Sequence, residues 1–232
     1  FAILDIIFAY ICNEYQKELF LRRRFTSELL EEFSSLIKSL SIFVENDSNW
    51  KRKIYRTTSE MVCDKLYNIF KDVFKCETRI SVEYTFQKRL ATNKFEKQVR
   101  MAGRKSRHRS QTRKAIPLER KKKYHSYQIF INNNLGMNIL KADDIKDDSI
   151  WYKNPDNNVD VKRYIGIAVS VLDNKEVNFI LQIDFLDDFK FGKHDTEEEI
   201  KNFVDNYLLS YINVVTLSYL LNLNGKKELI EV

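Results

Sequence analysis

The sequence predicts an α+β protein in which an antiparallel sheet is flanked by helices and preceded by a long N-terminal helix. Two apolar runs, 164–173 and 176–186, are rich in β-branched and aromatic residues and meet at polar residues, as the two strands of a β-hairpin do. Neither run alternates cleanly between apolar and polar residues, so we expect both faces of the hairpin to be covered. The hairpin should therefore lie at the centre of the sheet, with amphipathic helices packed against it.

The first 43 residues lack Gly and Pro, and their later half carries apolar residues at helical spacing: Leu29, Leu30, Phe33, Leu36, Ile37 and Leu40. This pattern predicts one helix, which would be about 60 Å long at about 1.5 Å per residue. So long a helix needs a partner helix, so we assign residues 1–46 to signalling and dimerisation and 47–232 to a globular domain. Lys17 and Arg22 to Arg24 follow an apolar start, which fits either a membrane-proximal helix or an amphipathic dimerisation helix.

A helix and two strands are predicted ahead of the central hairpin. The helix follows capping residues near Asp47 and ends near Cys76. The run 78–86 alternates between apolar and polar residues, so it is predicted as the first strand, with Glu83 on its outward face. The run 124–131 is also rich in aromatic and β-branched residues and is predicted as the second strand.

The segment between those strands, 87–123, is a basic insertion. It holds 15 Lys or Arg against Glu96 and Glu119, a net charge of +13 in a chain whose total is +6. The stretch 104–109 is too polar to build a core. Such a charge run fits a solvated loop, a nucleic-acid-binding surface, or a surface for an anionic membrane or an acidic partner. The cations expected to bind nucleic acid or another anion are Arg104, Lys105, Arg107, Arg109, Arg113 and Lys114.

Two further elements complete the predicted domain. Residues 132–163 form an irregular crossing segment, of the kind that often covers a functional site. Thr196 and Glu199 have the spacing of a capping box, which predicts the start of a closing helix. Gly225 is expected to stop that helix.

The order of elements around the hairpin resembles the GAF domain, a small-molecule sensor fold related to PAS. Three stretches carry the resemblance: 163–171 (RYIGIAVSV), 179–185 (FILQIDF), and 138–145 together with Trp151. The resemblance covers about residues 50–223. It implies a GAF-like, non-enzymatic cytoplasmic sensor or regulatory domain that binds a small ligand or a partner and signals through helix-mediated homodimerisation. It identifies neither the ligand nor a cofactor.

A GAF-like cavity would be lined by aromatic residues from the strands and the crossing segment. Trp151 and Tyr152 lie in a polar stretch and are the expected lid residues, and Arg163 is the expected contact for an anionic group. The predicted ligand-binding residues are Tyr84, Tyr127, Trp151, Tyr152, Arg163 and Tyr164.

No catalytic or metal site is predicted, so the chain is not expected to be an enzyme. His108, His125 and His194 have neither the spacing of metal ligands nor a partner set for nucleophilic catalysis. The three cysteines form no Cys-x-x-Cys pair, which favours a reducing cytoplasm. Two alternatives to the sensor are a nucleic-acid-binding module that uses 87–123 and the cytoplasmic domain of a regulator tethered to a membrane by a segment upstream of Phe1.

Overall fold

A computed structural model describes residues 50–91, 93–107, 114–152, 160–171 and 175–227, together with Ser27, Glu31, Ser34 and Lys38. Those four single residues are helical and exposed. The rest of the predicted N-terminal helix, with its dimerisation role, lies outside the described residues. No helix in the described part of the chain has both the length and the apolar character needed to span a membrane.

Six strands form one sheet in the spatial order β3-β2-β1-β6-β5-β4, and every neighbouring pair is antiparallel. The strands are β1 (Thr78–Arg89), β2 (Phe95–Lys105), β3 (Ile116–Pro117), β4 (Gly136–Leu140), β5 (Arg163–Val169) and β6 (Phe179–Phe185). The predicted apolar hairpin is β5–β6, and β6 lies between β1 and β5. The prediction of an α+β fold with an antiparallel sheet flanked by helices is therefore confirmed, including the central place of the hairpin.

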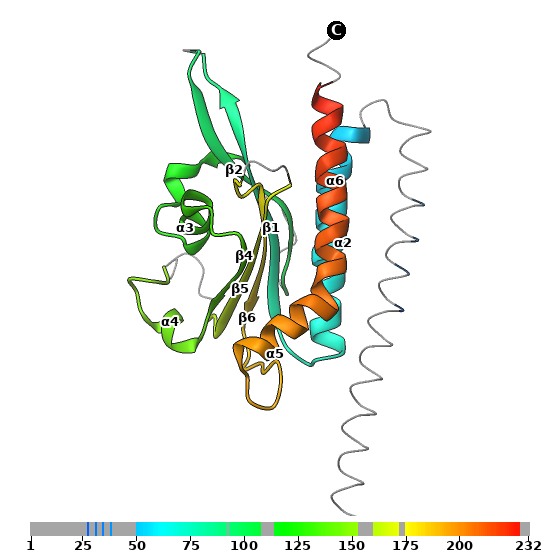
Figure 1. Cartoon of the computed structure of the whole chain (residues 1–232), viewed down its shortest axis with the longest axis vertical. Coiled ribbons are helices and arrows are strands. Elements are labelled where there is room, and N and C mark those ends of the chain that lie inside the picture. Colours follow the sequence, from blue (N-terminus) through cyan, green and yellow to red (C-terminus); the bar gives the residue numbers. More distant parts are fainter. Residues whose placement is uncertain are drawn as a thin grey trace, which may run out of the picture.

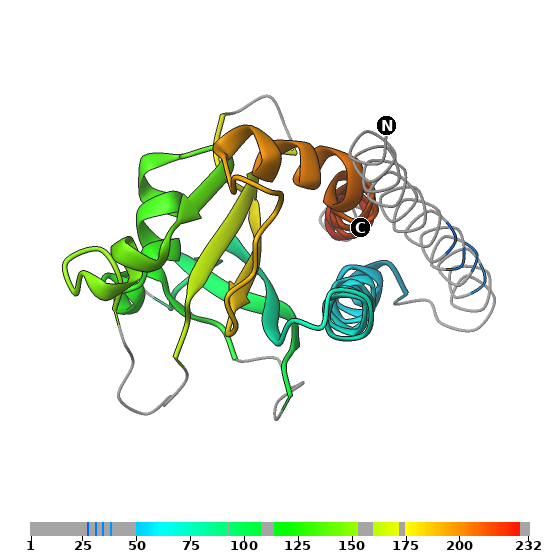
Figure 2. The same cartoon turned by 90° about the horizontal axis from the view of Figure 1, so that it is seen from below.

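Helices α2 (Trp50–Asp72) and α6 (Leu209–Lys227) lie side by side on one face of the sheet (Figures 1 and 2). The alternate residues of β1 and β6 that point to this face pack with both helices in the main hydrophobic core, since Ile80, Phe185, Leu66 and Val215 are fully buried there. Helices α2 and α6 cover this face, and a second layer, described below, covers the other. Because neither face of the sheet is left in solvent, β5 and β6 are apolar runs without a clean alternation.

A short helix, α5 (Glu197–Phe203), and a π-helical turn, η2 (Val204–Leu208), lead from β6 into α6. The predicted capping box is present: the Glu199 amide donates to Thr196 Oγ1 at 3.2 Å, and the Thr196 amide donates to the Glu199 carboxylate at 2.9 Å. The expectation that Gly225 ends this helix is wrong, because α6 continues to Lys227.

The opposite face of the sheet is covered by a 3-10 turn, η1 (Leu118–Lys121), and helices α3 (His125–Asn132) and α4 (Ala142–Lys146) (Figure 2). The prediction of a strand over 124–131 is wrong, because this run is α3. Ser126, Ile129 and Phe130 are its buried residues, at the spacing of one helix face, and Ile129 and Phe130 pack in a second hydrophobic core on this side. The crossing segment is also more regular than expected, since it contains β4 and α4.

The basic insertion contains strand β2, which pairs with β1 along most of its length. The prediction that 104–109 is too polar to join the core is wrong for Arg104, which is only 6% exposed. Glu83 was expected on a solvated face, but it is 5% exposed because η1 and α3 cover that face. Lysine and arginine stems can lie along a sheet when their charged ends find partners.

Candidate ligand-binding site

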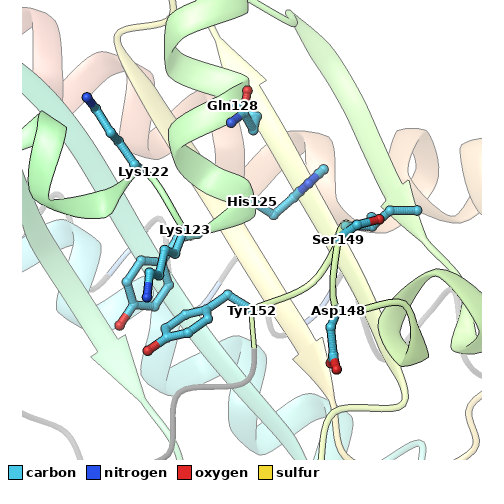
Figure 3. Close-up of a pocket in the computed structure, with 9 residues that line it drawn as sticks. Lys122, Lys123, His125, Gln128, Asp148, Ser149 and Tyr152 are labelled. Atoms are coloured by element: carbon cyan, nitrogen blue, oxygen red, sulfur yellow. The ribbon is translucent and has the colours of Figure 1, made fainter.

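A pocket of about 390 Å³ opens between the η1–α3 connection and the segment that precedes β5 (Figure 3). Its volume lies in the range of about 300–1,000 Å³ that is usual for small-molecule sites. One wall comes from residues 122–128 and the other from 148–152. The lining residues are Lys122, Lys123, Tyr124, His125, Gln128, Asp148, Ser149, Ile150 and Tyr152.

The pocket carries more positive than negative charge. Its charged lining residues are Lys122, Lys123 and Asp148, and the Lys122 ammonium is paired with the Glu119 carboxylate at 2.8 Å. The Lys123 ammonium lies 5.4 Å from the centre of the Tyr152 ring, and Figure 3 shows the two side chains next to each other. Lysine over an aromatic face is a cation–π contact. The arrangement therefore suits a small ligand that has an anionic group and an apolar or planar part.

His125, at the start of α3, contributes a polar atom without a partner to this region. Its Nε2 atom is buried and has no hydrogen-bond partner among the described residues. Burial lowers the pKa of His125, and the nearby Asp144 carboxylate opposes that shift only in part, so the imidazole is neutral at neutral pH. A neutral imidazole nitrogen either donates or accepts a hydrogen bond, but in this structure Nε2 is buried and out of contact with solvent.

An aromatic contact connects the pocket to the middle of the sheet. The ring of Tyr164 on β5 meets the His125 ring edge-on at 5.3 Å between centroids and lies 5.4 Å from the Trp151 ring. The Tyr164 hydroxyl donates to Gln182 Oε1 on β6 at 3.2 Å. A displacement of the pocket wall would thus reach both central strands.

A buried ion pair lies on the same face of the sheet. Lys121 Nζ, at the end of η1, is 2.5 Å from both carboxylate oxygens of Glu83 on β1 and 3.2 Å from the Ser126 hydroxyl on α3. Burial alone would raise the pKa of Glu83, but the Lys121 charge and hydrogen bonds from Lys121 and Gln182 outweigh it and lower the pKa. This ion pair connects η1, which lies next to the pocket, to strand β1 of the central sheet.

A second buried pair joins β1 to β6. Arg79 Nε is 2.5 Å from the Asp184 carboxylate. Burial raises the pKa of Asp184, because Arg79 and Arg104 offset the loss of solvation only in part and Glu83 adds repulsion. The face of the sheet under η1 and α3 is therefore polar and charged at its centre.

The structure brings together three of the six predicted ligand-binding residues. Tyr152 lines the pocket, and the Tyr164 ring contacts both the Trp151 ring and the ring of the pocket residue His125. All three are close to the wall formed by residues 122–128. Whether they bind a ligand stays a prediction.

The other three predicted residues lie elsewhere. Tyr84 faces the opposite core, where its ring meets Tyr55 at 5.1 Å. Tyr127 points its hydroxyl to the Glu119 carboxylate at 3.2 Å, outside the pocket. Arg163 makes a two-pronged ion pair with Asp195 and donates to the Phe189 carbonyl oxygen at 3.0 Å. The anionic group that Arg163 contacts in this structure is thus a carboxylate of the same chain.

The six cations of the predicted anion-binding set are also separated from one another. Arg104 is buried on the face that carries Asp184, and Lys105 Nζ is 2.5 Å from Asp64 on α2. Arg107 and Lys114 are exposed. Arg109 and Arg113 lie outside the described residues.

Several pocket residues were not nominated from the sequence. Lys122, Lys123 and His125 form one wall only because residues 125–132 are helical, which turns the end of the basic segment toward the crossing segment. The signal that could have found them is the i, i+3, i+4 pattern of Ser126, Ile129 and Phe130. Among the described residues, no three His, Cys, Asp or Glu side chains gather as metal ligands would.

No protein-family model matches the chain, and no curated protein matches it in sequence. Among solved structures, the chain is similar to the GAF domain of A. aeolicus nlh2 in an inactive state, with 11% identity, a TM-score of 0.43, and coverage of 83% of this chain and 98% of that chain. It is also similar to residues 122 to 287 of a methyl-accepting chemotaxis protein, with 10% identity, a TM-score of 0.40, and coverage of 78% and 98%.

A third similar structure is the PixJ GAF domain of Thermosynechococcus elongatus in its blue-light absorbing form, with 10% identity, a TM-score of 0.36, and coverage of 78% of this chain and 96% of that chain. The described residues of this chain form an antiparallel sheet with helices on both of its faces. Light absorption and chemotaxis are properties of those proteins.

Proposed function

We propose that this chain is a non-enzymatic regulatory domain that binds a small anionic ligand in the pocket between residues 122–128 and 148–152. The observation that carries the proposal is the pocket itself, which is about 390 Å³ in volume and has Lys123, Asp148, Tyr152 and His125 among its lining residues. Sensor roles among proteins of similar architecture add support of a general kind.

The proposed signal passes from the pocket to the helices on the other face. Ligand contact with Tyr152 or His125 moves the Trp151 and Tyr164 rings, and Tyr164 belongs to β5. At its first residue β5 carries Arg163, whose ion pair with Asp195 holds the loop ahead of α5. Helix α5 continues through the π-helical turn into α6, and such turns often occur at functional sites. Ligand occupancy would thus shift the population of α6 positions.

The proposed output is homodimerisation through the helical layer. Helix α6 exposes Leu209, Asn213 and Leu217 at intervals of four residues, and the two leucines are 45% and 49% exposed. A stripe of this spacing fits a partner helix. Light scattering of the full chain tests this step: we expect a dimer that Leu209→Asp combined with Leu217→Asp converts to a monomer, and a wild-type monomer at all concentrations would exclude it.

The ligand is tested by thermal unfolding with a panel of inorganic phosphate, nucleoside monophosphates and aromatic carboxylates. A ligand that binds the folded state raises the melting temperature. We expect at least one compound to do so for the wild type and for Tyr127→Ala, but not for Tyr152→Ala or Lys123→Ala. Tyr127 is the matched control because it is a half-buried tyrosine on α3 outside the pocket. A hit that survives Tyr152→Ala would contradict the site.

A further inference from the structure

The β1–β2 hairpin extends beyond the rest of the sheet as a two-stranded arm. Strand β6 pairs with β1 only from Thr78 to Tyr84, and β3 pairs with β2 only at Gln98 and Val99. The ends of the two strands, 87–89 and 95–97, therefore have each other as their only strand partners among the described residues. Figure 1 shows this hairpin projecting past α3 at the end of the molecule where α2 begins.

The turn of the arm is held by the backbone. The Leu90 amide donates to the Lys94 carbonyl oxygen at 2.8 Å, and the Asn93 amide donates to the Leu90 carbonyl oxygen at 3.0 Å. Asn93 adopts a left-handed conformation with φ 59°, which asparagine tolerates better than most residues. The side chains of the tip are thus presented on a defined scaffold.

The tip combines an exposed aromatic ring with unpaired cations. Phe95 is 69% exposed, the highest value among the exposed large apolar residues that the structure describes. Lys88, Arg89 and Lys94 lie at the same end of the arm, with Arg89 directly opposite Phe95 and Lys88 opposite Glu96. All three cations are exposed and form no ion pair with the described residues; Arg89 instead donates to the Asn93 side-chain oxygen at 3.0 Å. Leaving a phenylalanine ring in water forfeits the free energy of burying it, so a surface that covers this tip gains from it.

We propose that this arm docks on an anionic lipid surface, with Phe95 inserted at the level of the headgroups and Lys88, Arg89 and Lys94 against their negative charges. Aromatic rings flanked by lysine and arginine are favoured at the interface between membrane and water. The cations are attracted to the anionic leaflet, and each cation close to the membrane surface raises the binding affinity about fivefold.

The chemistry of the tip favours a lipid surface over nucleic acid. A β-ribbon that reads a DNA groove presents hydrogen-bonding side chains to base edges, whereas this tip presents Phe95 and Ala91, with the Asn93 side-chain oxygen already bonded to Arg89. Binding of single strands uses several stacking rings, and Phe95 is the one exposed aromatic ring on the arm. This proposal does not depend on the ligand-binding role of the pocket.

The test is co-sedimentation of the full chain with vesicles of phosphatidylcholine alone and of phosphatidylcholine mixed with phosphatidylserine. We expect binding to the mixed vesicles only, with an affinity that falls as salt is added. Replacing Lys88, Arg89 and Lys94 together by Gln should weaken binding about a hundredfold, and Phe95→Ser should weaken it about tenfold.

Matched controls keep these losses specific to the arm. Ile131→Ser removes an apolar side chain that is 45% exposed on α3, and Lys71→Gln with Arg107→Gln and Lys114→Gln removes three exposed cations elsewhere; all should bind as the wild type does. The proposal is overturned if both vesicle types bind equally, if the arm variants behave like the controls, or if a DNA or RNA oligonucleotide binds while the mixed vesicles do not.

Discussion

The buried pair between Glu83 and Lys121 gives the sharpest stability prediction. Their side chains are 7% and 11% exposed, and the ammonium lies 2.5 Å from the carboxylate. Lys121→Met would leave Glu83 as an ion in a site where Ser126 and Gln182 cannot replace the lost charge. Removing one partner of a buried pair typically costs about 3–5 kcal/mol of unfolding free energy, so we expect a loss of that size at pH 7.

The pH dependence of this loss follows from the shifts of the Glu83 pKa. In the wild type the pKa is lowered from its ordinary value of 4.5, so the pair stabilises fully above that value and the stabilisation fades as pH falls through the lowered pKa. In Lys121→Met burial dominates and the pKa rises, so the variant regains stability relative to the wild type on acidification, by up to about 1.4 kcal/mol per pH unit below the raised pKa.

Denaturant unfolding at pH 7 and at mildly acidic pH measures both effects. Lys122→Met is the matched control, because this neighbouring lysine is 66% exposed and pairs with Glu119 on the surface, where little stability is at stake. The double variant Glu83→Gln with Lys121→Met should recover most of the loss, since no isolated charge remains. A loss for Lys121→Met no larger than that for Lys122→Met would refute the account of this pair.

Three further predictions concern the frame around the site. Gly103→Ala should lower the unfolding free energy by about 3 kcal/mol, because a Cβ would lie 2.3 Å from the Ser59 carbonyl oxygen on α2. Gly136→Ala meets open space and should lower it by only about 1 kcal/mol, because of its φ of +82°. Equal losses in denaturant unfolding would contradict the close contact at Gly103. Arg163→Met should cost about 1–2 kcal/mol, and because Arg163 lowers the pKa of Asp195 that stabilisation is present at neutral pH and lost in acid; a wild-type unfolding curve for the variant would exclude it. Thr196→Ala should lower the unfolding free energy by about 1 kcal/mol, because the helix loses its N-terminal cap, whereas Thr196→Ser keeps a capping hydroxyl and should be as stable as the wild type. Thermal unfolding of both variants tests this prediction.

The central hairpin, α2 and the capped start of α5 could be predicted because their signals are local. The apolar runs of β5 and β6 are long and bounded, and the Thr196 capping box needs only four consecutive residues. The strand prediction for 124–131 is wrong because its aromatic and β-branched residues favour a strand, while the helix is selected by burial of Ile129 and Phe130 in a core formed with distant strands.

That single misreading explains the error at Glu83. Its alternation placed it correctly on the face away from the main core, but η1 and α3 cover this face, and Lys121 lies 38 residues away in sequence. Charge counting likewise could not show that β2 runs through the basic segment, since the cations there are held by partners such as Asp64. Contacts between residues this far apart in sequence form only when the sheet is assembled, so local sequence patterns do not predict them.

The pocket was predicted only in part for the same reason. Trp151, Tyr152 and Tyr164 were predicted as aromatic residues that would line the cavity implied by the family resemblance, and Trp151 and Tyr164 are in contact with each other. Lys122, Lys123 and His125 join them because residues 125–132 form a helix, which the i, i+3, i+4 spacing of Ser126, Ile129 and Phe130 indicates but the strand-forming composition of the run obscures. Arg163 was expected to meet an external anion, but the fold brings Asp195 to it from 32 residues away.

The central claim is that ligand binding in the pocket changes the position of helix α6. The most direct measurement is an amide NMR map of the full chain, titrated with the first compound of the panel that raises the melting temperature. We predict saturable shifts at residues 122–128 and 148–152, and with the same affinity at η2 and α6, with the α6 shifts abolished by Arg163→Met while the pocket shifts remain. Pocket shifts in the wild type without any change at α6, or α6 shifts that persist in Arg163→Met, would contradict the account.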